Sequence, residues 1–192
     1  MSEIEKMRAR LLDVIDQNSG YTQEDFDKEF SNTMNNKSDN DYRINFKFVN
    51  KSNNEDPEYA TSGASGFDLR ANLSEPIILS PKGGFEIVPT GLFFEIPENF
   101  EIQVRPRSGL AAKNQVTVLN TPGTVDSDYR GEVKIILINH GLTEFVINHG
   151  DRIAQGVVSA VYAKNTIKLE KVNEISSDTK RGEGGFGSTG KN

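Results

Sequence analysis

The chain has 192 residues and no cysteine, and its 28 acidic residues against 22 basic ones give a net charge of −6. This length suits one compact domain with appendages and is enough to bury a core without disulfides. The lack of cysteine excludes thiol catalysis and zinc sites built on thiolates, and it fits a reducing compartment. The acidic balance argues against general binding to nucleic acids or anionic membranes. We find neither a membrane-spanning run nor a targeting peptide, and therefore expect a cytoplasmic protein.

Residues 1–43 are predicted to form a short helical N-terminal extension followed by a linker. Hydrophobic residues recur at helical spacing from Ile4 to Ile15, and Thr22 with Asp25 resembles the start of a second short helix. Residues 31–41 are polar and rich in asparagine, which is typical of linkers. The extension holds ten acids and six bases, and thus most of the net negative charge. It either packs on the chain's own domain or binds a partner that the sequence does not identify.

After residue 43 the sequence pattern changes to short runs of β-prone residues, separated by glycine, proline and asparagine. Many strands at short spacing, with no long helix between them, predict an antiparallel sandwich or barrel. We therefore expect an all-β domain over residues 44–176. The predicted strands are 44–50, 85–88, 92–96, 101–104, 116–119, 133–138, 145–147, 153–161 and 167–172.

A basic segment follows the predicted strand 101–104. Arg105, Arg107 and Lys113 surround the small residues Ser108 and Gly109. A guanidinium group can donate two parallel hydrogen bonds to two oxygens of one phosphate. A small hydroxyl or a glycine amide can also approach a phosphate closely, so this composition suits phosphate binding. The alternative is a solvated basic strand end that leads into a short helical turn.

The segment 120–131, NTPGTVDSDYRG, lies between two predicted strands and should be a hairpin with a broad tip. Asp126 and Asp128 suggest a calcium loop, but that pattern needs an oxygen ligand at its fifth position and glutamate at its twelfth. Arg130 and Leu137 stand there, so the calcium interpretation fails. One carboxylate is then available as a general base. The alternative is a turn whose aspartates hydrogen-bond their own backbone.

Three further segments are weak indicators when each is taken separately. ASGFDLRA at 64–71 and GDRIAQ at 150–155 are each explained by a turn beside a strand. RGEGGFGSTG at 181–190 holds five glycines, whose N–H groups can converge on an anion while Arg181 adds further donors. The alternative for this last segment is a disordered tail.

In chain order, these five segments resemble the five motifs of the trimeric dUTP pyrophosphatases (dUTPases). The first is ASGFDLRA, the second RPRSGLA, the third NTPGTVDSDYRGEV, the fourth GDRIAQ and the fifth RGEGGFGSTG. The similarity extends over residues 44–190. It implies an all-β jelly-roll barrel, a flexible glycine-rich C-terminal arm over 177–192 that closes over the active site, and a homotrimer whose active sites are shared between subunits.

By this resemblance the protein hydrolyses dUTP to dUMP and pyrophosphate, which keeps uracil out of DNA and supplies dUMP for thymidylate synthesis. Asp126 is implied to be the base that activates water for attack on the α-phosphorus, and Tyr129 to pack against the deoxyribose. The implied uracil-binding residues are Asn120, Gly123, Thr124 and Val125. The implied phosphate-binding residues are Arg107, Ser108 and Gly109, and Gln155 is implied to position phosphate or water. From the arm, Arg181, Ser188 and Thr189 are implied to close over the γ-phosphate, Phe186 to stack on the uracil, and Gly187 to be a further substrate-binding residue.

The substrate also implies a metal ion. A triphosphate carries about four negative charges near neutral pH, and these must be neutralised before a carboxylate can activate water beside it. The sequence contains no compact cluster of metal-binding carboxylates, so Mg²⁺ is expected to be held mainly by the substrate phosphates and by water. Asp68, in the first motif, is expected to contact that metal through water only.

Three alternatives stay open at this stage. A dCTP deaminase, or a bifunctional deaminase and dUTPase, shares the family fold. A deaminase needs a glutamate near the second motif, and none lies between Glu101 and Glu132. A nucleotide-gated binding module would use the N-terminal extension to contact a partner. A purely structural jelly roll, such as a capsid or lectin domain, would not need the five motifs.

Overall fold

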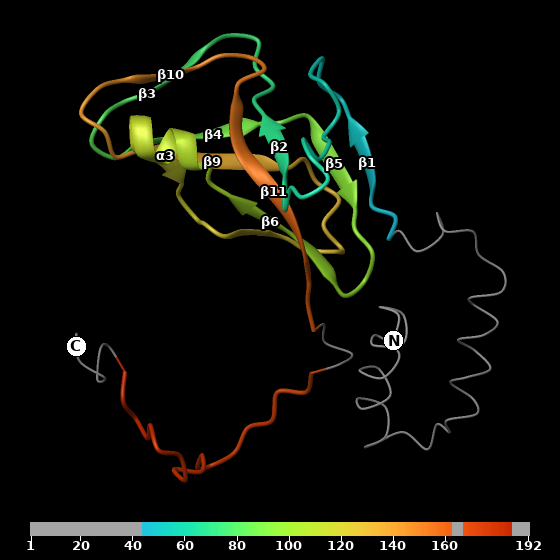
Figure 1. Cartoon of the computed structure of the whole chain (residues 1–192), viewed down its shortest axis with the longest axis vertical. Coiled ribbons are helices and arrows are strands. Elements are labelled where there is room, and N and C mark those ends of the chain that lie inside the picture. Colours follow the sequence, from blue (N-terminus) through green and yellow to red (C-terminus); the bar gives the residue numbers. More distant parts are fainter. Residues whose placement is uncertain (1–43, 163–166, 186–192) are drawn as a thin grey trace, which may run out of the picture. The chain divides into compact units, whose positions relative to one another are not determined.

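The computed structural model describes residues 44–162 and 167–185, so the helices predicted within 1–43 lie outside the described residues. The chain divides into two compact units, Met1–Asn45 and Phe46–Asn192, and the elements described below belong to the second (Figure 1). Its elements are β1 (Lys47–Asn50), β2 (Phe67–Arg70), β3 (Ile77–Leu79), β4 (Gly84–Pro89), β5 (Leu92–Glu95), β6 (Phe100–Arg105), α3 (Ser108–Asn114), β7 (Val116–Val118), β8 (Gly123–Val125), β9 (Lys134–Asn139), β10 (Phe145–Ile147) and β11 (Arg152–Ala160).

All described strands pair antiparallel, which confirms the predicted all-β class. One sheet has the order β2-β11-β6-β8 and a second has the order β4-β9-β7. Two smaller sheets join β1 to β5 and β10 to β3. Neighbouring strands in each large sheet are mostly not consecutive in sequence, so each sheet is assembled from segments that are far apart along the chain.

The prediction of a strand over 167–172 is wrong. This segment has no regular structure in the described part of the chain, and its apolar side chains are exposed, with Leu169 93% exposed. A β-prone run becomes a strand only when another strand or a packed face holds it. Three strands were not predicted, namely β2, β3 and β8; each is three or four residues long.

The predicted hairpin around 120–131 is confirmed, with one addition at its tip. β7 and β9 pair with each other in the second sheet, Val118 opposite Leu137. The connection between them contains β8, which leaves that sheet and pairs with β6, Gly123 opposite Val104 and Val125 opposite Ile102. The loop that carries the third motif is therefore hydrogen-bonded to both large sheets.

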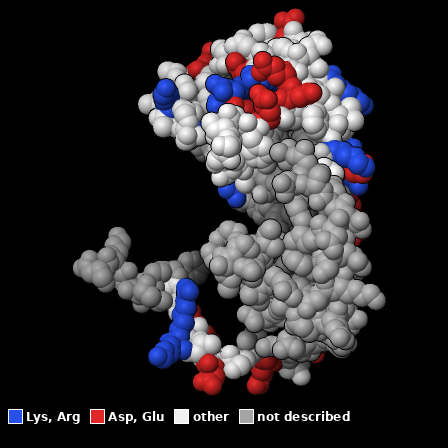
Figure 2. Space-filling model, turned by 45° about the vertical axis from the view of Figure 1, so that its right-hand side comes forward, with Lys and Arg blue, Asp and Glu red and all other residues white. Residues whose placement is uncertain are grey.

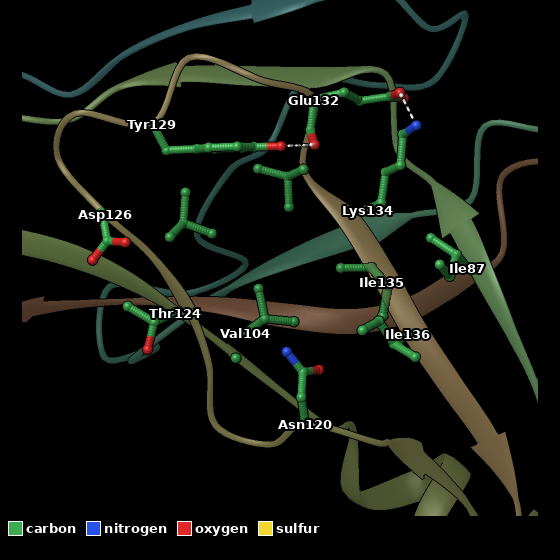
Figure 3. Close-up of a pocket in the computed structure, with 13 residues that line it drawn as sticks. Ile87, Val104, Asn120, Thr124, Asp126, Tyr129, Glu132, Lys134, Ile135 and Ile136 are labelled. Atoms are coloured by element: carbon green, nitrogen blue, oxygen red, sulfur yellow. Dashed lines mark hydrogen bonds and ion pairs between the residues drawn. The ribbon is translucent and has the colours of Figure 1, made fainter.

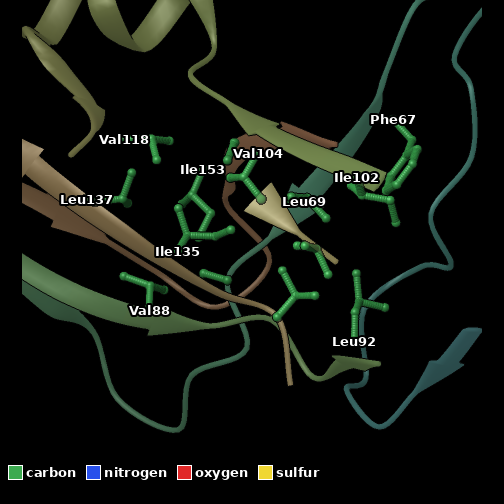
Figure 4. Packing of buried hydrophobic residues seen from close by; sticks show 14 of the residues in the cluster. Phe67, Leu69, Val88, Leu92, Ile102, Val104, Val118, Ile135, Leu137 and Ile153 are labelled. Atoms are coloured by element: carbon green, nitrogen blue, oxygen red, sulfur yellow. The ribbon is translucent and has the colours of Figure 1, made fainter. Parts of the chain in front are cut away.

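The hydrophobic core is one cluster that draws side chains from both large sheets (Figure 4). Along β9, Ile135 and Leu137 are fully buried, whereas Lys134 is exposed, as expected for a strand with one face on a core. Buried side chains of the β2-β11-β6-β8 sheet are Phe67, Leu69, Ile102, Val104, Val125 and Ile153, and those of the β4-β9-β7 sheet are Val88, Val116, Val118, Ile135 and Leu137. Burial of each such aliphatic side chain contributes about 1.5–3 kcal/mol.

One glycine in the core is required by an aromatic neighbour. Gly156 in β11 pairs with Phe67 in β2, and Phe67 is 7% exposed. A Cβ atom at position 156 would lie 2.6 Å from Cζ of the Phe67 ring. The glycine thus provides the space into which this ring packs, and it sits one residue beyond the predicted site residue Gln155.

The described surface mixes both signs of charge. Figure 2 shows acidic and basic side chains close to one another on the face in view. Ion pairs among the described residues include Arg70 with Glu55, at 2.8 Å. Among the described residues, no helix is long and apolar enough to cross a membrane.

Candidate active site

A cavity of about 260 Å³ lies beside the third motif (Figure 3). Six residues predicted to bind or hydrolyse the nucleotide line it together, and they come from β8 and the turns that flank it. They are Asn120, Gly123, Thr124, Val125, Asp126 and Tyr129. The lining also contains residues that the sequence interpretation did not include, namely Ile87, Val104, Glu132, Val133, Lys134, Ile135 and Ile136.

The uracil-binding candidates are held in place by the pairing of β8 with β6. Gly123 stands opposite Val104, and a Cβ atom on Gly123 would lie 3.1 Å from Nδ2 of Asn120 and 3.3 Å from Cβ of Val104. Glycine at this position therefore lets the Asn120 amide fold back beside β8. That amide offers two N–H donors and a carbonyl acceptor, the groups needed to read the edge of a base.

Asp126 follows β8 directly and is exposed at the cavity. Its backbone carbonyl accepts a hydrogen bond from the N–H of Tyr129, at 3.1 Å, which forms a tight turn. In the described ranges, the Asp126 carboxylate takes part in no hydrogen bond or ion pair, in contrast to Asp151, whose Oδ2 accepts from the N–H of Asn148 at 2.8 Å. The alternative of a turn aspartate bonded to its own backbone is thus not observed at Asp126, and its oxygens are available to water.

Tyr129 forms one wall of the cavity and is 44% exposed. Its hydroxyl donates a hydrogen bond to the backbone carbonyl of Glu132, at 3.0 Å (Figure 3). The Glu132 carboxylate accepts in turn from the N–H of Gly91, at 2.8 Å. Glu132 lies within the third motif, but the sequence interpretation assigned it no role, because its contact to Gly91 spans 41 positions.

The phosphate-binding candidates form a second cluster, assembled by three strands. β2, β11 and β6 are neighbours, and Gln155 stands opposite both Asp68 and Arg105. Nε of Arg107 lies 2.9 Å from Oδ1 of Asp68, and Arg152 contacts the other carboxylate oxygen at 3.3 Å. The Gln155 amide donates to the carbonyl of Pro106, at 2.9 Å. Segments one, two and four are therefore joined side chain to side chain.

Ser108 and Gly109 are the first two residues of α3, and both are exposed. Arg107 caps this helix with extended backbone, at φ −91° and ψ 128°. The basic segment thus leads from a strand into one short helix, as the structural alternative for it proposed. Arg107 itself, however, is ion-paired to Asp68 rather than solvated alone.

Within one chain, the phosphate-binding candidates do not line the cavity beside the third motif. The 260 Å³ cavity is lined by residues of the third motif and of β4, β6 and β9. The lining does not include Asp68, Arg107, Ser108, Gly109 or Gln155.

The fifth motif is described only in part. Nε of Arg181 donates to the carbonyl of Gly184, at 2.8 Å, and Gly182 has a positive φ of 51°. Among residues 167–185 there is neither helix nor strand, and Arg181 is exposed. The predictions for Phe186, Gly187, Ser188 and Thr189 lie outside the described residues.

Comparisons with known proteins identify the family of the chain. The family model described as dUTPase matches residues 52–190. The deoxyuridine 5'-triphosphate nucleotidohydrolase of Bdellovibrio bacteriovorus is 58% identical over 135 residues, which cover 70% of this chain and 87% of that protein. The enzyme of the same name from Cytophaga hutchinsonii is 51% identical over 145 residues, which cover 76% of this chain and 91% of that protein.

Solved structures of dUTPases share the fold. The dUTPase of Staphylococcus bacteriophage 80alpha with dUPNHPP has a TM-score of 0.67 at 24% identity, covering 77% of this chain and 99% of that one. A mutant dUTPase from phage phi11 of S. aureus, whose structure reveals how a structural Mg(II) ion is coordinated, has a TM-score of 0.60 at 20% identity, with 70% and 100% covered. Because the family match spans most of the sequence and the relatives exceed half identity, the chain belongs to the dUTPase family.

Proposed function

We propose that this protein hydrolyses dUTP to dUMP and pyrophosphate. The observation that carries the proposal is the single cavity at which Asn120, Asp126 and Tyr129 meet, because it combines a base-reading amide, an unpaired carboxylate and an aromatic wall. Family membership and the names of the similar proteins from Bdellovibrio and Cytophaga support the same substrate.

In this proposal the residues around β8 bind the nucleoside. Asn120 and the backbone of Gly123, Thr124 and Val125 read the uracil edge, and Tyr129 packs against the deoxyribose. Favourable contacts alone distinguish two bases that differ by one methyl group only by about 10- to 200-fold. A rigid cavity that leaves no space for a C5 methyl group on the base is therefore needed. The pairing of β8 with β6 supplies that rigidity.

Asp126 acts as the general base. A water molecule gives its proton to the carboxylate while its oxygen forms a bond to the α-phosphorus, and the bond from that phosphorus to the bridging oxygen breaks, releasing pyrophosphate. Exposure of Asp126 at the cavity admits the water, and the absence of other partners for its carboxylate among the described residues leaves it free to accept the proton.

The phosphates are proposed to be bound by Arg107, Ser108, Gly109 and Gln155, with Arg181 and residues 187–189 closing over them and Phe186 stacking on the uracil. Because the phosphate cluster does not line the nucleoside cavity of its own chain, we propose that a neighbouring subunit supplies it within a homotrimer. An apolar face next to the cavity supports this assembly: Phe85 and Ile87 on β4 pair with Ile138 and Ile136 on β9, and Phe85 and Ile87 are more than half exposed.

Mg²⁺ fits this arrangement as an ion carried by the substrate. The described residues contain no group of three or more His, Cys, Asp or Glu side chains able to hold a metal. The phosphates themselves are then the main ligands, and the ion, when bound, neutralises their charge. Both Asp68 oxygens already bind guanidinium groups, but each keeps a lone pair that can accept from a metal-bound water.

The direct test is pyrophosphate release by purified protein supplied with dUTP and Mg²⁺. Parallel reactions with dTTP, dCTP and UTP measure selectivity for the base and the sugar, and an ammonia assay with dCTP tests for deamination. Selective cleavage of dUTP is expected. Equal cleavage of all four nucleotides, or ammonia release from dCTP, would refute the proposal.

A further inference from the structure

We propose that Glu132 and Gly131 are positioning residues that fix Tyr129, and that they thereby set discrimination between deoxyribonucleotides and ribonucleotides. The inference rests on the proposed function, in which the Tyr129 ring packs against the deoxyribose. Figure 3 shows the Tyr129 side chain extended along the cavity wall, with its hydroxyl at the Glu132 carbonyl. The hydrogen bond between them measures 3.0 Å.

The acceptor of that hydrogen bond is itself held in place. Oε1 of Glu132 accepts from the N–H of Gly91, at 2.8 Å, and the Glu132 side chain is only 22% exposed. Gly91 lies in the turn between β4 and β5 with a positive φ of 72°, which glycine adopts without strain. A partly buried carboxylate bonded to a backbone N–H resists displacement, because breaking the bond leaves both groups poorly solvated.

The next residue, Val133, is fastened to the same turn by two more hydrogen bonds. Its carbonyl accepts from the Thr90 hydroxyl at 2.6 Å, and its N–H donates to the carbonyl of Leu92 at 2.8 Å. Thr90 is 1% exposed and also accepts from the N–H of Leu92 at 3.1 Å. The segment that receives the Tyr129 hydroxyl is thus joined to the β4–β5 turn at three points.

Gly131 supplies the space that Tyr129 needs. A Cβ atom at this position would lie no more than 2.9 Å from three atoms at the hydroxyl end of the Tyr129 ring. Any other residue would push the ring away from the Glu132 carbonyl or distort the turn. Glycine at 131 and the anchored carbonyl at 132 therefore select one position of the ring.

A fixed ring matters for sugar selectivity. A hydrophobic wall discriminates weakly against an added hydroxyl when it can move aside, since the larger sugar then finds room. A wall held by the Gly91–Glu132–Tyr129 chain of hydrogen bonds cannot retreat without breaking them. We therefore expect Glu132 and Gly131 to control the ratio of activity on dUTP to activity on UTP.

The test compares kcat/KM for dUTP and for UTP in four full-length variants. Gly131→Ala and Glu132→Ala are expected to lower the dUTP/UTP ratio by about tenfold, the size of effect that repositioning one wall contact produces. Glu132→Gln keeps an oxygen that can accept from Gly91 and should retain a ratio near that of the parent. Gly63→Ala is the matched control, because a Cβ there meets nothing within 4 Å.

Melting temperature and oligomeric state of each variant are measured alongside the ratio, so a change in selectivity is separated from a change in folding. If Gly131→Ala fails to fold, Glu132→Ala and Glu132→Gln still decide the question. An unchanged dUTP/UTP ratio in a folded, active Gly131→Ala or Glu132→Ala protein overturns the inference. Absence of dUTP cleavage by the parent protein would instead overturn the proposed function.

Discussion

The Arg107 guanidinium lies 2.9 Å from the Asp68 carboxylate, and this ion pair joins the start of α3 to β2. Both side chains are partly buried, at 29% and 28% exposed, so water screens the pair only in part. Arg152 contacts the second Asp68 oxygen at 3.3 Å. Asp68 thus contacts two guanidinium groups at once, which would orient Arg107 in the proposed phosphate site.

We expect Asp68→Asn to raise KM for dUTP by about tenfold with a smaller change in kcat, because a released Arg107 side chain must be ordered again when phosphate binds. Steady-state kinetics at saturating Mg²⁺ measure the effect. Glu55→Gln, which removes the exposed partner of Arg70, is the control. A change confined to the Mg²⁺ concentration needed for half-maximal rate would show instead that Asp68 acts through the metal's water shell.

Asp126→Asn is expected to lower kcat by a factor of about 10² to 10⁴, the usual contribution of a general base, while dUTP still binds. Single-turnover hydrolysis and binding of a non-hydrolysable dUTP analogue separate the two effects. Asp128→Asn is the matched control, because Asp128 lies in the same turn but outside the cavity lining. Loss of activity in the Asp128 variant with retention in the Asp126 variant would reassign the base.

A chain that stops after Thr179 is expected to fold like the parent but to turn over dUTP poorly. It keeps every described strand, and it lacks the arm residues proposed to close over the phosphates. Five glycines make this arm costly to order, so bound substrate must provide the compensating contacts. Circular dichroism and kcat/KM test both halves of the prediction, and a truncated enzyme with the parent's kcat/KM would remove the arm from the mechanism.

Phe85→Asp is expected to weaken the proposed trimer, because it places a charge on the apolar face of β4 and β9. Light scattering at several protein concentrations measures the change in mass. Leu142→Asp, at a position 76% exposed in the turn after β9, is the control and should leave the mass unaltered. Equal behaviour of the two variants would place the subunit interface elsewhere.

Gly156→Val is expected to destabilise the fold by about 1–3 kcal/mol, the usual cost of adding carbon atoms to a filled core. The added atoms would meet the Phe67 ring, which is buried and cannot swing into solvent. Urea denaturation gives the free energy of unfolding, and Gly63→Ala serves as the reference for a glycine with open space around it. Unchanged stability would mean that the ring repacks freely.

The sequence predicted those parts of the fold and site that depend on local patterns. The strand expected over 145–147 is β10, and the six third-motif residues assigned to the site line one cavity. The strand expected over 167–172 does not form, because β propensity at Leu169 cannot replace a partner strand. The role of Glu132 could not be predicted from local sequence either, because it depends on a hydrogen bond to Gly91, which is 41 positions away.

Because β7 and β9 lie in one large sheet while β8, between them in sequence, is paired into the other, the segment bearing Asp126 connects the two large sheets. A shift of one large sheet relative to the other would therefore displace the Asp126 carboxylate. The proposed function of Asp126 is thereby tied to the integrity of both large sheets, and disruption of either sheet should inactivate the protein.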